Sequence, residues 1–102
     1  MTHQKYILVD GQPKPVDLIT WAKWFEGSDR HVAKDRFGEW TVSTIFLGMD
    51  HRFGGDGPPL LFETMVLNDE GQDKFCERSA TIDEARASHA RGIAFAKAKL
   101  SN

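Results

Sequence analysis

The sequence has little cysteine: Cys76 is the only one among its 102 residues. One cysteine forms neither an internal disulfide nor a cysteine-based zinc cluster, and it suits a reducing compartment. We expect it to be a small buried side chain rather than a reactive thiol. No window approaches the roughly 18 apolar residues of a membrane span, and the N-terminus lacks a secretory signal pattern. We therefore expect cytoplasmic residence and no membrane partner.

The sequence also lacks an excess of charge of either sign. It has 13 Lys and Arg against 15 Asp and Glu, a formal net charge of -2, and no basic block. Binding to nucleic acid through phosphate neutralisation is therefore disfavoured. Hydrophobic residues make up 40% of the chain and charged residues 27%, which favours a globular protein over a disordered one. This length predicts a single domain, residues 1–102.

The first third of the chain predicts a strand or small hairpin followed by a helix. Lys5 to Val9 favours a strand that ends at the turn dipeptide Asp10-Gly11. Pro13 and Pro15 then forbid a helix before about residue 16. The helix should be about ten residues long. Its expected features are a capping Asp17, an apolar stripe of Leu18, Trp21, Ala22 and Phe25, and a left-handed stop at Gly27.

The middle of the chain predicts an antiparallel meander. β-Branched and aromatic residues alternate with polar ones, and turn-forming residues separate the runs. The apolar residues on both faces of the second run suit a central strand. The expected strands are His31 to Phe37, Trp40 to Met49, Leu60 to Leu67 and Lys74 to Ser79, with turns at Gly38-Glu39 and Asn68-Asp69-Glu70-Gly71.

The last twenty residues predict a helix that packs on this meander. Thr81 and Glu84 have the spacing of a capping box. His89 lies on the apolar stripe, where a hydrogen-bonded packing residue is more common than a ligand. The expected stripe is Ile82, Ala85, His89, Ile93, Ala96 and Leu100. The sequence therefore predicts an α+β fold, an antiparallel β-meander of four to five strands packed by two helices.

A loop of about ten residues, DHRFGGDGPP from Asp50 to Pro59, joins two strong strand candidates. Hairpin loops usually need only two to five residues. Its glycines permit unusual backbone angles and its two prolines stiffen the exit. This loop is the first candidate binding site, and the alternative is a plain surface loop anchored by Phe53 in the core. Its candidate binding residues are Asp50, His51, Arg52, Phe53 and Asp56.

Glu63 interrupts an apolar strand face between Leu61 and Met65. A buried charge needs a partner, so we expect an ion pair with one of the nearby arginines, Arg36, Arg52 or Arg78, rather than catalysis. The alternative is that Glu63 joins Asp50 and His51 in a site that binds a metal ion or provides acid and base groups. The chain carries no diagnostic catalytic or phosphate-binding motif. We therefore assign no catalytic residue, no cofactor and no metal.

Two aromatic residues lie off the apolar stripes of the predicted helices. Phe95 points nearly opposite the stripe of the last helix, and Trp24 flanks the stripe of the first. Exposed aromatic side chains are enriched at binding hot spots, so both are candidate contact points with another protein. The alternatives are an extra packed layer and a homodimer seam.

The run VSTIFLGMDHRFGGDGPPLLFETMV, from Val42 to Val66, resembles a pattern in small proteins of bacteriophages and prophages. The opening YILVDGQPKPVDLITWAKWFE and the acidic start of the last helix are similar to that group too. The recurring positions are Asp50, His51, Phe53, Gly54, Pro58, Phe62, Glu63 and Thr64. The resemblance implies an accessory phage or prophage gene product that acts in the cytoplasm of a bacterial host cell, and it brings no catalytic assignment with it.

These observations predict a non-enzymatic accessory protein that binds another protein, of the host or of the phage. The specific hypothesis is an inhibitor of a host system, including antiviral defence, that docks through the glycine-rich loop and Phe95. One alternative is a small-ligand-binding or metal-dependent enzyme that uses the Asp50-His51 loop. Another is a structural or assembly protein of the phage, for which a homodimer would be the first sign.

Overall fold

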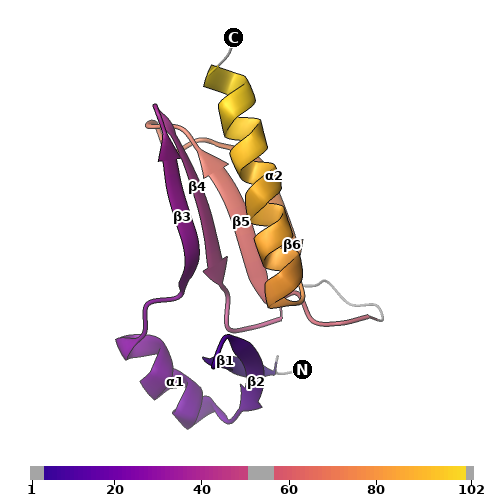
Figure 1. The fold of residues 1–102 in the computed structure, drawn as a ribbon. Helices are drawn as coiled ribbons and strands as arrows, with labels where there is room; N and C mark the ends of the chain where they lie inside the picture. The colour runs from indigo at the N-terminus through magenta and orange to yellow at the C-terminus, as the bar shows by residue number, and fades with distance from the viewer. Residues whose placement is uncertain (1–3, 51–56, 101–102) are drawn as a thin grey trace.

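The computed structural model describes residues 4–50 and 57–100. Four antiparallel strands form one sheet in the order β3-β4-β5-β6, and β1 and β2 pair separately. Helix α2 lies along one face of the four-stranded sheet, while α1 and the β1–β2 pair lie at one end of it (Figure 1). This arrangement confirms the predicted α+β fold with a meander and two helices. The elements are β1 (Lys5–Val9), β2 (Gln12–Val16), α1 (Leu18–Gly27), β3 (His31–Phe37), β4 (Trp40–Phe46), β5 (Phe62–Leu67), β6 (Asp73–Ser79) and α2 (Ile82–Leu100).

The β1–β2 hairpin turns at the predicted Asp10-Gly11 dipeptide. Both residues have positive φ, 51° and 79°, as a two-residue turn of type I′ requires. The hairpin is attached to the segment after β4, because the backbone N–H of Tyr6 donates to the carbonyl of Gly48 over 2.9 Å. Together with α1 it forms an N-terminal unit, residues 4–27. This unit continues the long axis of a molecule that measures 47 × 32 × 24 Å.

Helix α1 begins as predicted and ends differently. The Asp17 carboxylate accepts from the backbone N–H of Thr20 over 2.7 Å, so it is the N-cap of a ten-residue helix. The expected left-handed stop at Gly27 is wrong. Gly27 is the last helical residue, and the chain leaves through Ser28 in an extended conformation with φ -108° and ψ 141°.

The main sheet follows the predicted meander. Gly38 has φ 61° at the first position of the β3–β4 turn, which is the angle of a type II′ turn. The two central strands are shorter than expected. β4 ends at Phe46 instead of Met49, and β5 starts at Phe62 instead of Leu60. The β3–β4 register shifts between His31 and Ala33, which marks a β-bulge at Val32. A second register shift lies in the β5–β6 ladder.

Helix α2 starts at the predicted capping box. The backbone N–H of Glu84 donates to the Thr81 hydroxyl, and the backbone N–H of Thr81 donates to the Glu84 carboxylate, each over 3.1 Å. Among the described residues, no helix has both the length and the apolar composition needed to cross a membrane.

The buried face of α2 is centred on Gly92 rather than on Ile93. A Cβ atom at Gly92 would lie 2.9 Å from Cγ1 of Val42, so the helix approaches the sheet this closely only because Gly92 has no side chain. The predicted stripe is therefore only partly right, since Ile93 is half-buried and Leu100 is 51% exposed. The buried residues are Ile82, Ala85, Ser88, His89, Gly92 and Ala96.

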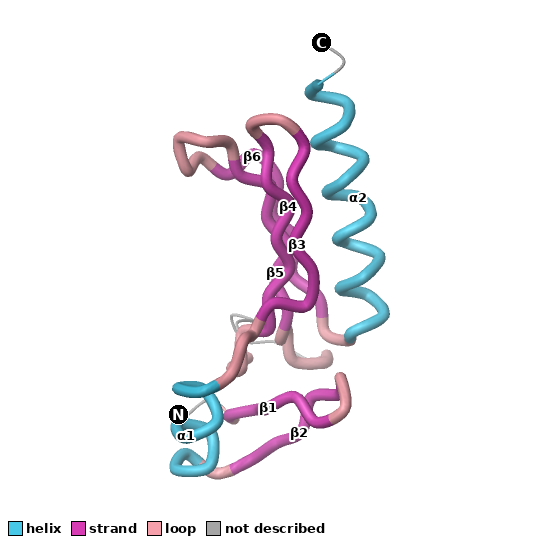
Figure 2. The backbone as a smooth tube through the Cα atoms, turned by 60° about the vertical axis from the view of Figure 1, so that its left-hand side comes forward, coloured by secondary structure: helices cyan, strands magenta, loops and turns pink. Residues whose placement is uncertain are grey.

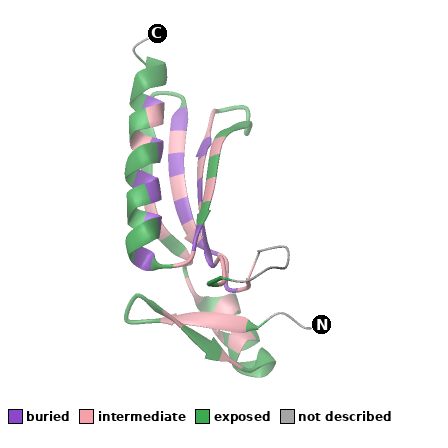
Figure 3. Ribbon diagram, turned by 90° about the vertical axis from the view of Figure 1, so that its right-hand side faces the viewer, coloured by how far each residue is buried: buried purple, intermediate pink, exposed green. Residues whose placement is uncertain are grey.

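The core lies between α2 and one face of the sheet. β4 and β5 alternate between buried and half-buried residues along their length (Figure 3). The buried side chains form two apolar clusters, one near each end of the sheet. The first is Phe46, Leu61, Phe62, Ile82 and Ala85, and the second is Trp40, Val42, Val66 and Ala96.

Candidate functional site

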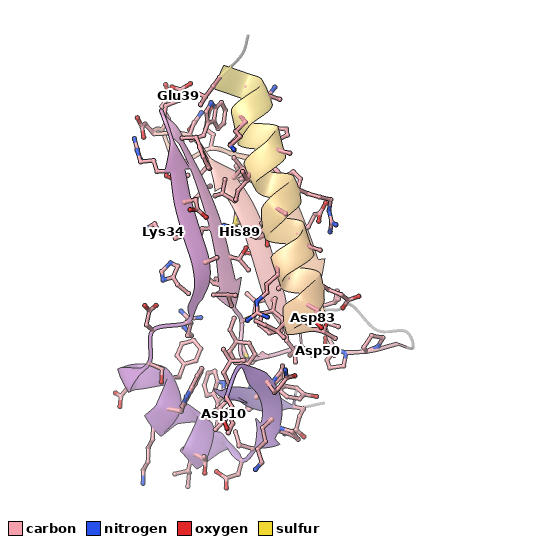
Figure 4. All side chains as sticks on the ribbon, in the orientation of Figure 1. Asp10, Lys34, Glu39, Asp50, Asp83 and His89 are labelled. Atoms are coloured by element: carbon pink, nitrogen blue, oxygen red, sulfur yellow. The ribbon has the colours of Figure 1, made fainter. Side chains whose placement is uncertain are left out.

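A chain of polar side chains separates the two apolar clusters. The Asp35 carboxylate lies 2.8 Å from Nε2 of His89, and Nδ1 of His89 lies 2.8 Å from the Thr44 hydroxyl. The Thr44 hydroxyl in turn lies 2.6 Å from that of Thr64. The chain joins β3, β4 and β5 to α2, and Figure 4 shows His89 on the part of α2 that lies against the sheet. We call these four residues the polar layer.

The polar layer has the carboxylate–histidine–hydroxyl order of a nucleophilic triad. A nucleophile must be reached by its substrate, however, and Thr44 is 0% exposed. Thr64 is 1% and His89 6% exposed. Because the hydroxyls are sealed between sheet and helix, the polar layer satisfies buried polar groups and does not present a nucleophile. The expectation that His89 is a hydrogen-bonded packing residue is confirmed.

The glycine-rich loop is described only at its two ends. Asp50 closes the base of the loop, because its carboxylate accepts from the backbone N–H of Leu60 over 3.0 Å. At the other end Gly57 has φ 116°, an angle that favours glycine. The remaining candidate residues of this loop, His51, Arg52, Phe53 and Asp56, lie outside the described residues. The loop's proposed role in binding therefore stays a prediction.

Glu63 forms the ion pair expected for it. Its carboxylate accepts from Nε of Arg78 over 3.0 Å, across the β5–β6 ladder. The pair lies on the face of the sheet that α2 does not cover, which we call the open face. In residues 4–50 and 57–100, no three His, Cys, Asp or Glu side chains come together in a way that could hold a metal ion.

Phe95 is not the exposed contact that the sequence predicted. It is half-buried and packs between Trp40, at a ring-centroid distance of 6.5 Å, and Phe75, at 5.6 Å. Because the face of α2 that meets the sheet is centred on Gly92, the ring of Phe95, three residues further on, also lies against the sheet. The alternative of an extra packed layer describes it better.

Trp24 is also packed rather than exposed. Its ring meets that of Phe46 edge-on at 5.7 Å and so fastens α1 to the end of the sheet. Trp21 approaches Gly48 closely, because a Cβ atom there would lie 2.9 Å from the indole nitrogen. The inner face of α1 is therefore formed by Trp21, Trp24 and Phe25, all half-buried.

Cys76 is exposed, so the expectation of a buried side chain is wrong. It lies opposite Met65 on the open face, and β6 is the last strand of the sheet. Its immediate neighbours still remove part of its hydration, and this desolvation raises the pKa of the thiol. The nearby Glu63 carboxylate raises the pKa further. A neutral thiol is a weak nucleophile.

Helix α1 carries two exposed large apolar residues, Leu18 and Ile19, of which the sequence analysis placed Leu18 on the apolar stripe. Leu18 is 62% and Ile19 69% exposed, and no residue of α1 is buried. Helical periodicity identified an apolar stripe but not which of its members another element covers. We call five of the exposed side chains of this helix the α1 outer surface: Leu18, Ile19, Ala22, Lys23 and Glu26.

The α1 outer surface is the candidate interaction site, because exposed large aliphatic side chains gather there. No protein-family model, curated protein or solved structure matches the chain. The resemblance to phage and prophage proteins stays a prediction.

Proposed function

We propose that this chain is a non-enzymatic accessory protein that binds another protein, with the α1 outer surface as its docking element. The exposure of Leu18 and Ile19 supports this proposal most directly. Burying one such side chain contributes roughly 1.5–3 kcal/mol. Two adjacent ones provide the apolar centre that a protein interface needs.

The composition of α1 supports the same conclusion. Six of the ten residues in LITWAKWFEG are apolar. A helix that is apolar around most of its circumference is usually buried on more than one side. Within residues 4–50 and 57–100, other parts of the chain cover the side of Trp21, Trp24 and Phe25, so a partner would cover Leu18 and Ile19.

The partner should offer an apolar groove. An amphipathic helix docks in such a groove through side chains spaced four apart, as Leu18 and Ala22 are. Lys23 and Glu26 would lie at the polar rim of this interface. With the phage-like sequence pattern, this supports a host protein as the partner. Inhibition of an antiviral defence system is the specific form that we propose.

The experiment combines capture with a phage-growth assay. Tagged protein is expressed in a bacterium that carries a defence system, and the captured complex is sized by light scattering. We expect a stoichiometric complex and restored plaque formation. The double substitution Leu18→Glu and Ile19→Glu should abolish both, because it places two charges in the apolar centre.

Val9→Glu is the matched control. Val9 is 41% exposed on the β1–β2 hairpin, outside the α1 outer surface, and receives one charge, so it is compared with the single substitution Ile19→Glu. It should leave capture and plaque formation intact. Equal loss in both variants, or no loss in the α1 variant, would contradict the proposal, and a partner-free dimer broken by the α1 changes would favour the assembly alternative.

A further inference from the structure

The open face of the sheet holds a concavity beside β3. Its volume is about 750 Å³, and its walls come from β3, β4 and the β5–β6 turn. Figure 2 shows that this turn leans out on the side of the sheet away from α2. The turn is well built, since the Asn68 side chain accepts from the backbone N–H groups of Glu70 and Gln72, each over 3.0 Å.

Three basic side chains line this concavity: His31, Lys34 and Arg36. In a regular strand, residues 31 and 34 point to opposite faces. The β-bulge at Val32 adds one residue, so that His31 pairs with Ile45 while Lys34 pairs with Ser43. Ile45 and Ser43 lie two apart on β4, so His31 is brought to the same face as Lys34. Bulges often serve to redirect a side chain in this way.

Acidic groups nearby form close pairs with two of these three side chains. Asp69 pairs with Arg36 over 2.6 Å, and Asp29 pairs with His31 over 2.9 Å. The Asp35 carboxylate is held on the other side by His89. Within residues 4–50 and 57–100, Lys34 has no hydrogen bond or close ion pair, and the charge that acts on it is the more distant Asp29 carboxylate.

We propose that this concavity binds an acidic segment of another protein, with a carboxylate held between Lys34 and Arg36. The hydroxyls of Thr41 and Ser43 line its floor and add hydrogen-bond donors for the same carboxylate. Asp69 acts as an internal competitor, because it already occupies one side of the Arg36 guanidinium. This site does not depend on the α1 outer surface.

An acidic protein segment fits better than nucleic acid. Among the described residues that line the concavity, the imidazole of His31 is the one aromatic ring, and Asp29 already holds its Nδ1, so the surface on which bases could stack is small. The chain as a whole has a net charge of -2, which repels a long phosphate backbone with many charges more strongly than a short segment with a few carboxylates. A second copy of the chain docked through the same concavity would place its Lys34 and Arg36 against those of the first copy, and like charges repel.

The test measures fluorescence anisotropy of a labelled peptide of five Glu-Ala repeats at low salt. Lys34→Glu and Arg36→Glu should each weaken binding about tenfold, equivalent to about 1.4 kcal/mol. Asp69→Asn should strengthen binding about threefold, because it frees the guanidinium. Chemical shift changes should be confined to β3, β4 and the β5–β6 turn.

Matched variants distinguish binding in this concavity from an effect of the protein's overall charge. Lys14→Glu on β2 and Asp83→Asn on α2 repeat the same charge changes elsewhere on exposed positions and should leave the affinity unchanged. A peptide of Gln-Ala repeats should not bind. The proposal is overturned if the distant variants act like the local ones, if Asp69→Asn weakens binding, if the Glu-Ala peptide does not bind, or if an oligonucleotide of equal charge binds more tightly.

Discussion

The imidazole of His89 hydrogen-bonds the hydroxyl of Thr44 over 2.8 Å at the boundary between two apolar clusters. This contact fixes how α2 sits on the sheet. Sliding the helix by one turn would leave the His89 imidazole buried without Thr44 and Asp35, at a cost of about 1–3 kcal/mol, while Thr44 would keep only its contact with Thr64. The polar layer therefore specifies one register of helix on sheet, while the apolar clusters supply most of the driving force.

Thr44→Val should destabilise the protein by about 1–3 kcal/mol, although valine has nearly the same shape. The substitution leaves His89 and Thr64 without their shared partner. Thr41→Val is the control, because Thr41 lies on the same strand but on the open face. Urea unfolding of both variants measures the difference, and an equal effect at the two positions would contradict the account of the polar layer.

Gly92→Ala should destabilise the protein even though alanine favours helices. The new methyl group would meet Val42 at 2.9 Å, and overpacking of this kind costs about 1–3 kcal/mol. Gly27→Ala in α1 adds the same methyl group where no atom lies within 4 Å, so it should be neutral or slightly stabilising. Thermal unfolding of the two variants gives the comparison, and a Gly92→Ala protein as stable as the parent would be incompatible with the described packing.

The Glu77–Arg91 ion pair predicts a pH dependence. Two guanidinium nitrogens of Arg91 donate to the Glu77 carboxylate, over 3.0 and 2.7 Å, and these bonds hold the pKa of Glu77 below its usual value of 4.5. A lowered pKa in the folded state stabilises the fold above the unfolded-state pKa, and this contribution is lost as the pH falls through the folded-state pKa. Compared with Glu77→Gln, the parent should keep a constant advantage from pH 7 to 5 and lose it progressively below about 4.5. An advantage that grew on acidification would refute this assignment.

Much of the fold was predictable because local chemistry specifies it. Asp10-Gly11 allows positive φ at both turn positions, Asp17 supplies a capping carboxylate, and Thr81 with Glu84 cap each other. None of these features depends on distant parts of the chain. The alternation of buried and half-buried residues in β4 and β5 likewise follows from the pattern of the strands themselves.

The candidate sites were harder to predict because exposure depends on distant packing. Leu18 lies on the predicted apolar stripe of α1, yet it is 62% exposed. Phe95 lies off the predicted stripe, yet the close approach at Gly92 brings it against the sheet. The bulge at Val32 has no clear signal in the sequence either, and it decides which face His31 joins.

The most direct test of the docking role of α1 is photo-crosslinking from single positions in cells with an active defence system. A photoreactive side chain replaces Ile19 on the α1 outer surface or, as the control, Val9 on the hairpin. We predict a single crosslinked product of defined mass from position 19 and none from position 9. Crosslinking from position 9 alone, or from neither position while the protein still restores plaque formation, would contradict the claim that α1 is the docking element.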